Sequence, residues 1–109
     1  MKLKTFEEYE FDNTRDYNNE IDLILDALKE KGIETEDPKS HYNLYRTKKS
    51  VSFIIDGCPV QLSFVSGDVA IIIEIDGITD NFGTYDVDTK LDTVIDILAN
   101  FSKKKYLDN

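Results

Sequence analysis

Between residues 51 and 75 the chain alternates apolar and polar side chains, and two tight-turn dipeptides interrupt the alternation. The first run covers residues 51–55, and residues 60–65 and 69–75 repeat the pattern. A period of two is typical of a strand, because successive side chains point to opposite faces of a sheet. The segment therefore predicts three consecutive β-strands that share one strongly apolar face.

The two dipeptides agree on how these strands pair. Asp56-Gly57 is a strong two-residue hairpin turn, and it would place Phe53 opposite Val60 on the apolar face. A second two-residue turn at residues 66–67 keeps the next pair of strands in the same register. A slip of one residue would move every apolar side chain to the other face. The turns therefore predict an antiparallel meander with a defined register.

The segment before the meander predicts a loop followed by another strand. Residues 34–40 are polar and contain Pro38, which interrupts regular structure, so we expect a loop there. Residues 42–47 then alternate, which predicts a strand whose Leu44 lies near Phe53. This strand would be the first of four.

Two amphipathic helices flank the strands. Apolar side chains recur at the helical period over residues 16–31 and again over residues 91–101. Gly32 is expected to end the first helix in a Schellman motif, and Asp88 to cap the second at its N-terminus. The three lysines at residues 103–105 are expected to complement the negative pole of the second helix.

The order of these elements predicts an α+β fold with the order α-β-β-β-β-α. Each helix must bury its apolar side, and the sheet offers one strongly apolar face. We therefore expect an antiparallel meander with an N-terminal and a C-terminal helix packed on that face. For residues 78–85 the sequence leaves two structures possible, a long loop or a short fifth strand. The 109 residues form one domain, in which residues 1–12 are an acidic arm, either a short helix or disordered.

The formal net charge is −9, from 22 acidic and 13 basic residues. A strongly acidic domain repels nucleic acid and anionic membranes and is attracted to basic protein surfaces. Direct nucleic-acid binding and membrane binding are therefore disfavoured, and the longest apolar run, residues 69–73, is too short to span a bilayer. Solubility alone also makes many domains acidic, and that explanation stays open.

The acidity is concentrated in the first 40 residues, which hold 12 acidic and 6 basic side chains. Aromatic residues alternate with the acids of the arm, which suits a contact that is steered by charge and anchored by buried rings. A solvated helix face beside an acidic arm is the alternative. The carboxylates that we expect to bind a partner are Glu7, Glu8, Glu10 and Asp12 in the arm, and Asp22, Asp26 and Glu30 on the first helix.

Catalytic and metal-binding patterns are weak. His41 is the single histidine and Cys58 the single cysteine, so a nucleophilic site would depend on His41 and a zinc site would lack ligands. The Asp and Asn residues between 76 and 88 do not have the spacing of an EF-hand. We therefore expect no catalysis, no cofactor and no metal. Cys58 is expected to pack as a small hydrophobic side chain, and one cysteine fits a reducing cytoplasm.

These observations favour a small non-enzymatic inhibitor that occludes a basic surface of a partner such as a nuclease or toxin. A toxin immunity protein and a phage anti-defence protein of the anti-CRISPR type, with charge that mimics DNA, both fit. The many Ile, Asn, Asp, Lys and Tyr residues indicate an AT-rich bacterial or phage genome. The alternative is an acidic secretion or assembly chaperone that forms a homodimer through Ile54, Val65 and Ile72 on the opposite sheet face. A small hydrolase or metal enzyme using His41 or the Asp76–Asp88 loop is the weakest candidate.

Overall fold

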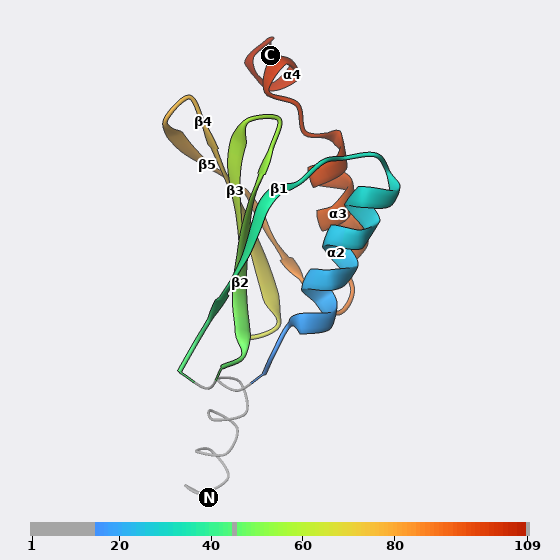
Figure 1. Cartoon of the computed structure of the whole chain (residues 1–109), viewed down its shortest axis with the longest axis vertical. Helices are drawn as coiled ribbons and strands as arrows, with labels where there is room; N and C mark the ends of the chain where they lie inside the picture. The colour runs from blue at the N-terminus through green and yellow to red at the C-terminus, as the bar shows by residue number, and fades with distance from the viewer. Residues whose placement is uncertain (1–14, 45, 109) are drawn as a thin grey trace, which may run out of the picture.

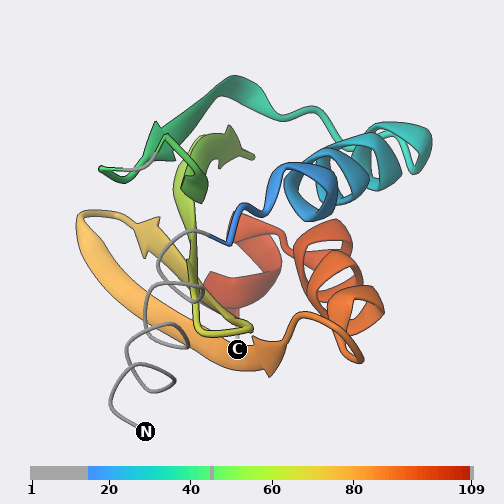
Figure 2. The ribbon, with the colours of Figure 1, turned by 90° about the horizontal axis from the view of Figure 1, so that it is seen from below.

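The computed structural model describes residues 15–44 and 46–108, which form one sheet and three helices. Helix α2 (Asn18–Glu30) precedes strands β1 (Glu36–Tyr42), β2 (Lys48–Ile55), β3 (Cys58–Val65), β4 (Asp68–Ile75) and β5 (Ile78–Asp86), and helices α3 (Leu91–Asn100) and α4 (Lys103–Asp108) follow. The strands are antiparallel and lie in the order β1-β2-β3-β4-β5 (Figure 1). Helices α2 and α3 lie side by side on one sheet face (Figure 2). The predicted α+β fold is confirmed, with five strands.

Three two-residue turns determine the register of the central strands. Both residues of each turn have positive φ angles, as type I′ hairpin turns require. Phe53 pairs with Val60 and Phe64 pairs with Val69, so the predicted register is confirmed. The three turns are Asp56-Gly57, Ser66-Gly67 and Asp76-Gly77.

The first strand does not lie where the sequence pattern predicts it. β1 occupies the segment expected to be a loop, and it contains Pro38. An edge strand tolerates proline because one side of its backbone has no neighbouring strand to bond, and the pairing with β2 is also interrupted between Glu36 and Lys39. Most of β1 is exposed on both faces, so no alternation of apolar side chains marks it.

The predicted strand at residues 42–47 is instead mostly a loop between β1 and β2. The Asn43 backbone N–H donates to the Thr47 carbonyl at 3.1 Å, and the Asn43 side-chain oxygen accepts from the Thr47 N–H at 3.1 Å. These bonds hold the chain between Asn43 and Thr47 in a tight loop. Leu44 is consequently 88% exposed and does not pack near Phe53 as the alternation predicts.

β5 is longer than the short fifth strand that the sequence leaves open. Ile71 of β4 pairs with Gly83, and the next residue of β4 pairs with Asn81, so Phe82 is an extra residue in β5. Gly83 has a φ of 116°, and a Cβ atom there would lie 2.6 Å from the Tyr85 hydroxyl. The backbone at this bulge therefore favours glycine at position 83. Phe82 is the extra residue of the bulge.

The two main helices end differently from each other. Gly32 has a φ of 81°, its N–H donates to the Lys29 carbonyl, and the Ile33 N–H donates to the Leu28 carbonyl at 2.9 Å. This is the predicted Schellman motif. Helix α3 ends at Asn100, and the extended backbone of Phe101 separates it from α4. The three lysines thus belong to a separate helix and not to the end of α3, where the sequence pattern places them.

The start of α3 also differs from the prediction. Lys90 is the N-cap residue and no side chain caps the helix, so Asp88 does not have the expected role. The Asp88 carboxylate instead accepts a hydrogen bond from the Arg15 guanidinium at 3.1 Å. This contact joins the segment before α2 to the segment before α3.

The core lies between the sheet and helices α2 and α3. Tyr17, which directly precedes α2, is fully buried and stacks on Phe64 with ring centroids 4.8 Å apart. Its hydroxyl accepts a hydrogen bond from the Gly67 N–H at 3.0 Å. The start of α2 is therefore anchored to the turn between β3 and β4. No helix among those described is long and apolar enough to cross a membrane.

Candidate functional site

Helix α2 carries a row of carboxylates on the side that faces away from the core. They recur every four residues, which places them on one side of the helix, and the buried residues of α2 lie on the other. All three are exposed. Leu23 lies on the same side and is 57% exposed. The row consists of Asp22, Asp26 and Glu30, the helical residues that the sequence predicts as a partner site.

Helix α3 carries two more exposed carboxylates. Asp92 and Asp96 are exposed and lie one turn apart, and α3 contains no lysine or arginine. Because α2 and α3 lie side by side on the sheet (Figure 2), the sides of both helices that face away from the sheet belong to the same outer surface of the protein. We call this surface the acidic helix face. It comprises Asp22, Asp26 and Glu30 of α2 and Asp92 and Asp96 of α3.

Few contacts within the protein neutralise these carboxylates. The Lys48 ammonium lies 3.7 Å from an Asp22 oxygen; the Lys48 side chain is 18% exposed and that of Asp22 64%, and a pair open to solvent on one side contributes about 0–1 kcal/mol. Among residues 15–44 and 46–108, no ion pair involves the other four carboxylates. They are available to cations of a partner.

Asp92 and Asp96 are not among the residues that the sequence predicts as a partner site. They lie far from α2 along the chain, in a part where acidic residues are less concentrated. The signal in the sequence is that the polar side of α3 holds acidic and uncharged residues only. The other predicted group, Glu7, Glu8, Glu10 and Asp12, lies outside the described residues.

The candidate nucleophiles lie on opposite faces of the sheet. His41 is exposed, and its Nε2 atom lies 2.7 Å from the Ser52 hydroxyl on the face without helices. Cys58 is 1% exposed and packs in the core, as predicted. The two side chains therefore form no dyad. The described residues contain no cluster of three or more His, Cys, Asp and Glu side chains suited to a metal.

The environment of Cys58 makes its thiol unreactive. Burial raises the pKa of Cys58, the negative charges of Asp56 and Asp76 raise it further, and the positive charge of Lys103 opposes them. Less thiolate therefore forms at a given pH than for a free cysteine. At about pH 8 we expect a disulfide reagent to react with the folded protein at least about 100-fold more slowly than with the denatured protein. The release of the coloured thiol is the measurement, Cys58→Ser is the blank, and equal rates would contradict a buried thiol.

The face of the sheet without helices does not present one apolar patch. Val65 is 65% exposed, and along β3 it is followed on that face by the polar Ser63 and Gln61, which pair with Ala70 and Ile72 of β4. Ile54 and Ile72 are half-buried. The surface on which the chaperone alternative depends is thus interrupted by polar side chains.

The described surface that most resembles a recognition surface is therefore the acidic helix face. It combines carboxylates on two rigid elements with Leu23, an apolar side chain that a partner can cover. Comparison of the chain with protein-family models, with curated proteins and with solved structures found no match.

Proposed function

We propose that this protein is a small non-enzymatic inhibitor that binds a basic surface of another protein, such as the nucleic-acid channel of a nuclease or toxin. The observation that carries the proposal is the acidic helix face, the exposed carboxylates of two helices that lie side by side on the sheet (Figure 2). Toxin immunity and phage anti-defence are the two biological settings that this binding mode suits. In both settings the inhibitor acts by occupying the surface that nucleic acid would use.

The charge of the helices supports a partner that is basic. Helices α2 and α3 together contain six acidic residues and one lysine. A surface of one sign on rigid elements attracts a basic partner over several ångströms and raises the association rate by about 10–1,000-fold. Once the surfaces meet, Leu23 supplies an apolar contact that loses its exposure to water.

The spacing of the charges indicates attraction by complementary charge and not a close copy of DNA geometry. Carboxylates four residues apart on a helix are separated by about 6 Å along its axis. Duplex DNA carries one negative charge for about every 1.7 Å of its axis. The acidic helix face is thus less densely charged than a duplex, so its effect depends on placing its carboxylates opposite particular lysines and arginines of the partner.

The proposal is tested by isolating the partner and measuring inhibition. The tagged protein is used to capture proteins from its native host at low salt, and the captured protein is purified and assayed with increasing inhibitor. We expect a basic partner that is inhibited at one-to-one stoichiometry, with an association rate that falls at least about 10-fold between roughly 0.05 and 0.5 M salt. A partner without a basic surface, an association rate that salt does not change, or binding without inhibition would each contradict the proposal.

A further inference from the structure

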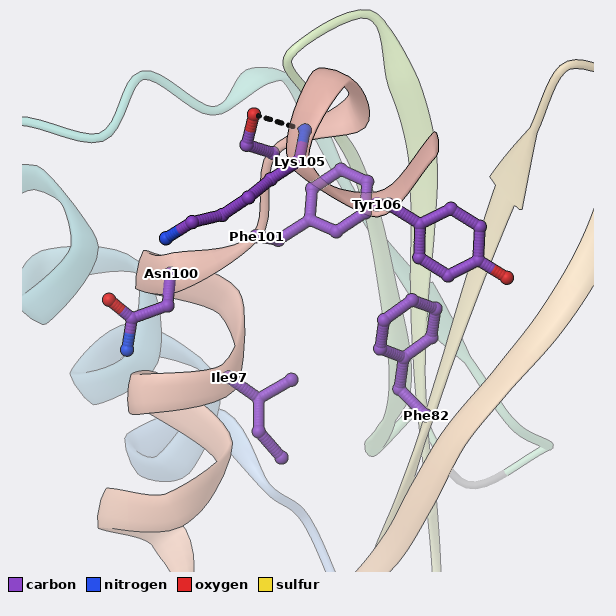
Figure 3. A pocket seen from close by; sticks show the side chains of 7 residues that line it. Phe82, Ile97, Asn100, Phe101, Lys105 and Tyr106 are labelled. Atoms are coloured by element: carbon purple, nitrogen blue, oxygen red, sulfur yellow. Dashed lines mark hydrogen bonds between the residues drawn. The ribbon is translucent and has the colours of Figure 1, made fainter. Parts of the chain in front are cut away.

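A small pocket lies where α3 ends and α4 packs against β5 (Figure 3). Its volume is about 180 Å³. The apolar wall consists of side chains from all three elements, and three polar residues, among them Ser102, lie around it. The wall is formed by Phe82, Ile97, Phe101 and Tyr106, and the rim by Asn100 and Lys105.

The aromatic rings of the wall leave part of their surface uncovered. Phe82 meets Phe101 edge to face with ring centroids 5.9 Å apart, and it meets Tyr106 at 5.8 Å. Phe82 and Phe101 are only partly buried, and Tyr106 is 38% exposed. Another aromatic ring that enters the pocket can therefore contact rings on more than one side, an arrangement that aromatic pairs favour.

Contacts with other parts of the protein fix the position of α4, which forms one wall of the pocket. A helix of six residues is too short to be stable alone, so other parts of the protein must hold it. The Lys103 ammonium lies 2.7 Å from Asp76, and the Lys103 backbone N–H donates to Asp56 at 2.8 Å. The Tyr106 hydroxyl donates a hydrogen bond to the Asp80 carboxylate. A wall that is already in place binds a ligand without the cost of ordering it.

The charge at the rim differs from that of the rest of the protein. In a chain of net charge −9, α4 carries three consecutive lysines. Lys103 is paired with Asp76, whereas Lys104 and Lys105 are exposed and form no ion pair with any described residue. Lys105 lines the pocket directly. The pocket thus joins an aromatic interior to a rim that carries one exposed ammonium group, that of Lys105.

The size of the pocket indicates one side chain and not a whole cofactor. Small-molecule sites are commonly about 300–1,000 Å³, whereas a cavity of roughly 150 Å³ holds a benzene ring. We propose that the pocket binds a short acidic peptide segment of a partner protein, with one aromatic side chain inserted among Phe82, Phe101 and Tyr106. A neighbouring carboxylate of the peptide then meets Lys105 and the Asn100 amide. This site adjoins the acidic helix face, since Asn100 lies one turn after Asp96 and its side-chain amide donates to the Asp96 carbonyl at 2.9 Å, but it does not depend on the proposed inhibition.

The first test uses the full chain and three blocked pentapeptides. The probe is Glu-Glu-Phe-Glu-Glu, and the controls are Glu-Glu-Ala-Glu-Glu, which lacks the ring, and Gln-Gln-Phe-Gln-Gln, which lacks the charge. In an NMR titration of the labelled protein we expect saturable shifts at the pocket residues, with a Kd of the order of 0.1–1 mM for the probe. Each control should bind at least about 5-fold more weakly. Shifts elsewhere, no saturable shifts, or equal binding of the alanine peptide would overturn the proposal.

The second test compares two exposed lysines on the same helix. Lys105→Gln removes the charge that lines the pocket, and Lys104→Gln removes the same charge from a residue that does not line it. We expect Lys105→Gln to weaken binding of the probe about 5-fold and Lys104→Gln by less than about 2-fold. Both side chains are exposed, so both variants should fold. Equal losses would show that only general charge attracts the peptide, and would overturn the assignment of Lys105.

Discussion

Replacing Tyr17 by alanine is expected to lower the free energy of unfolding by about 3–5 kcal/mol. The side chain is fully buried, stacks on Phe64, and accepts a hydrogen bond from the Gly67 N–H. The substitution would leave a cavity and detach the start of α2 from the turn between β3 and β4. A domain of this size has a total stability of about 5–15 kcal/mol, so the variant would be close to unfolding. Urea unfolding followed by circular dichroism gives the measurement.

Two further variants separate the sources of this loss. Tyr17→Phe keeps the ring and removes only the hydroxyl that accepts from Gly67, so we expect a loss of about 1 kcal/mol. Tyr42→Ala removes a tyrosine that is 58% exposed, and we expect a change within about 0.5 kcal/mol. A loss below about 1 kcal/mol for Tyr17→Ala would show that α2 does not depend on this anchor.

Neutralising the acidic helix face is expected to slow association with a basic partner by about 10–100-fold. The variant combines Asp22→Asn, Asp26→Asn, Glu30→Gln, Asp92→Asn and Asp96→Asn, which keep the side-chain shapes and change the net charge from −9 to −4. All five side chains are exposed, so stability should change little. Stopped-flow or surface-based kinetics with the isolated partner measure the rate, and the dependence on salt should become weaker as well.

The control for this variant makes the same charge change elsewhere. It neutralises five other exposed carboxylates on the sheet and its adjoining loop, Glu34, Glu36, Asp37, Asp68 and Glu74. The control should slow association by less than about 3-fold, because these groups are not on the proposed contact. Equal slowing by both variants would mean that net charge, and not the acidic helix face, governs association. A third variant at Glu7, Glu8, Glu10 and Asp12 tests the predicted contribution of the arm.

The central strands could be predicted because local and long-range constraints agree there. The dipeptides at residues 56–57 and 66–67 favour two-residue turns with positive φ angles, and those turns place the apolar residues of β2, β3 and β4 on the same face. Gly32 is similar, since a residue with a φ of 81° at the end of a helix strongly favours glycine. In these places the chemistry of a few neighbouring residues is enough to determine the local structure.

The edge strands could not be predicted in the same way. β1 is exposed along nearly all of its length, so it lacks the alternation that burial of one face produces. Pro38 normally argues against a strand, but its missing N–H costs little at an edge and beside an interruption in pairing. β5 has a bulge at Phe82 that shifts its alternation. Both strands form because β2 and β4 offer them backbone partners.

The sequence by itself determined the α+β class, the register of the central strands, the inward stripe of each main helix and the overall negative charge. These properties depend on periodicity and turn chemistry within short segments. Only the tertiary structure decided which charges act together. It brought α3, which carries Asp92 and Asp96, beside α2 (Figure 2), and it placed the lysines in a helix separate from α3, with Lys105 at the rim of an aromatic pocket. Such neighbours come from packing between distant segments, which no local pattern records.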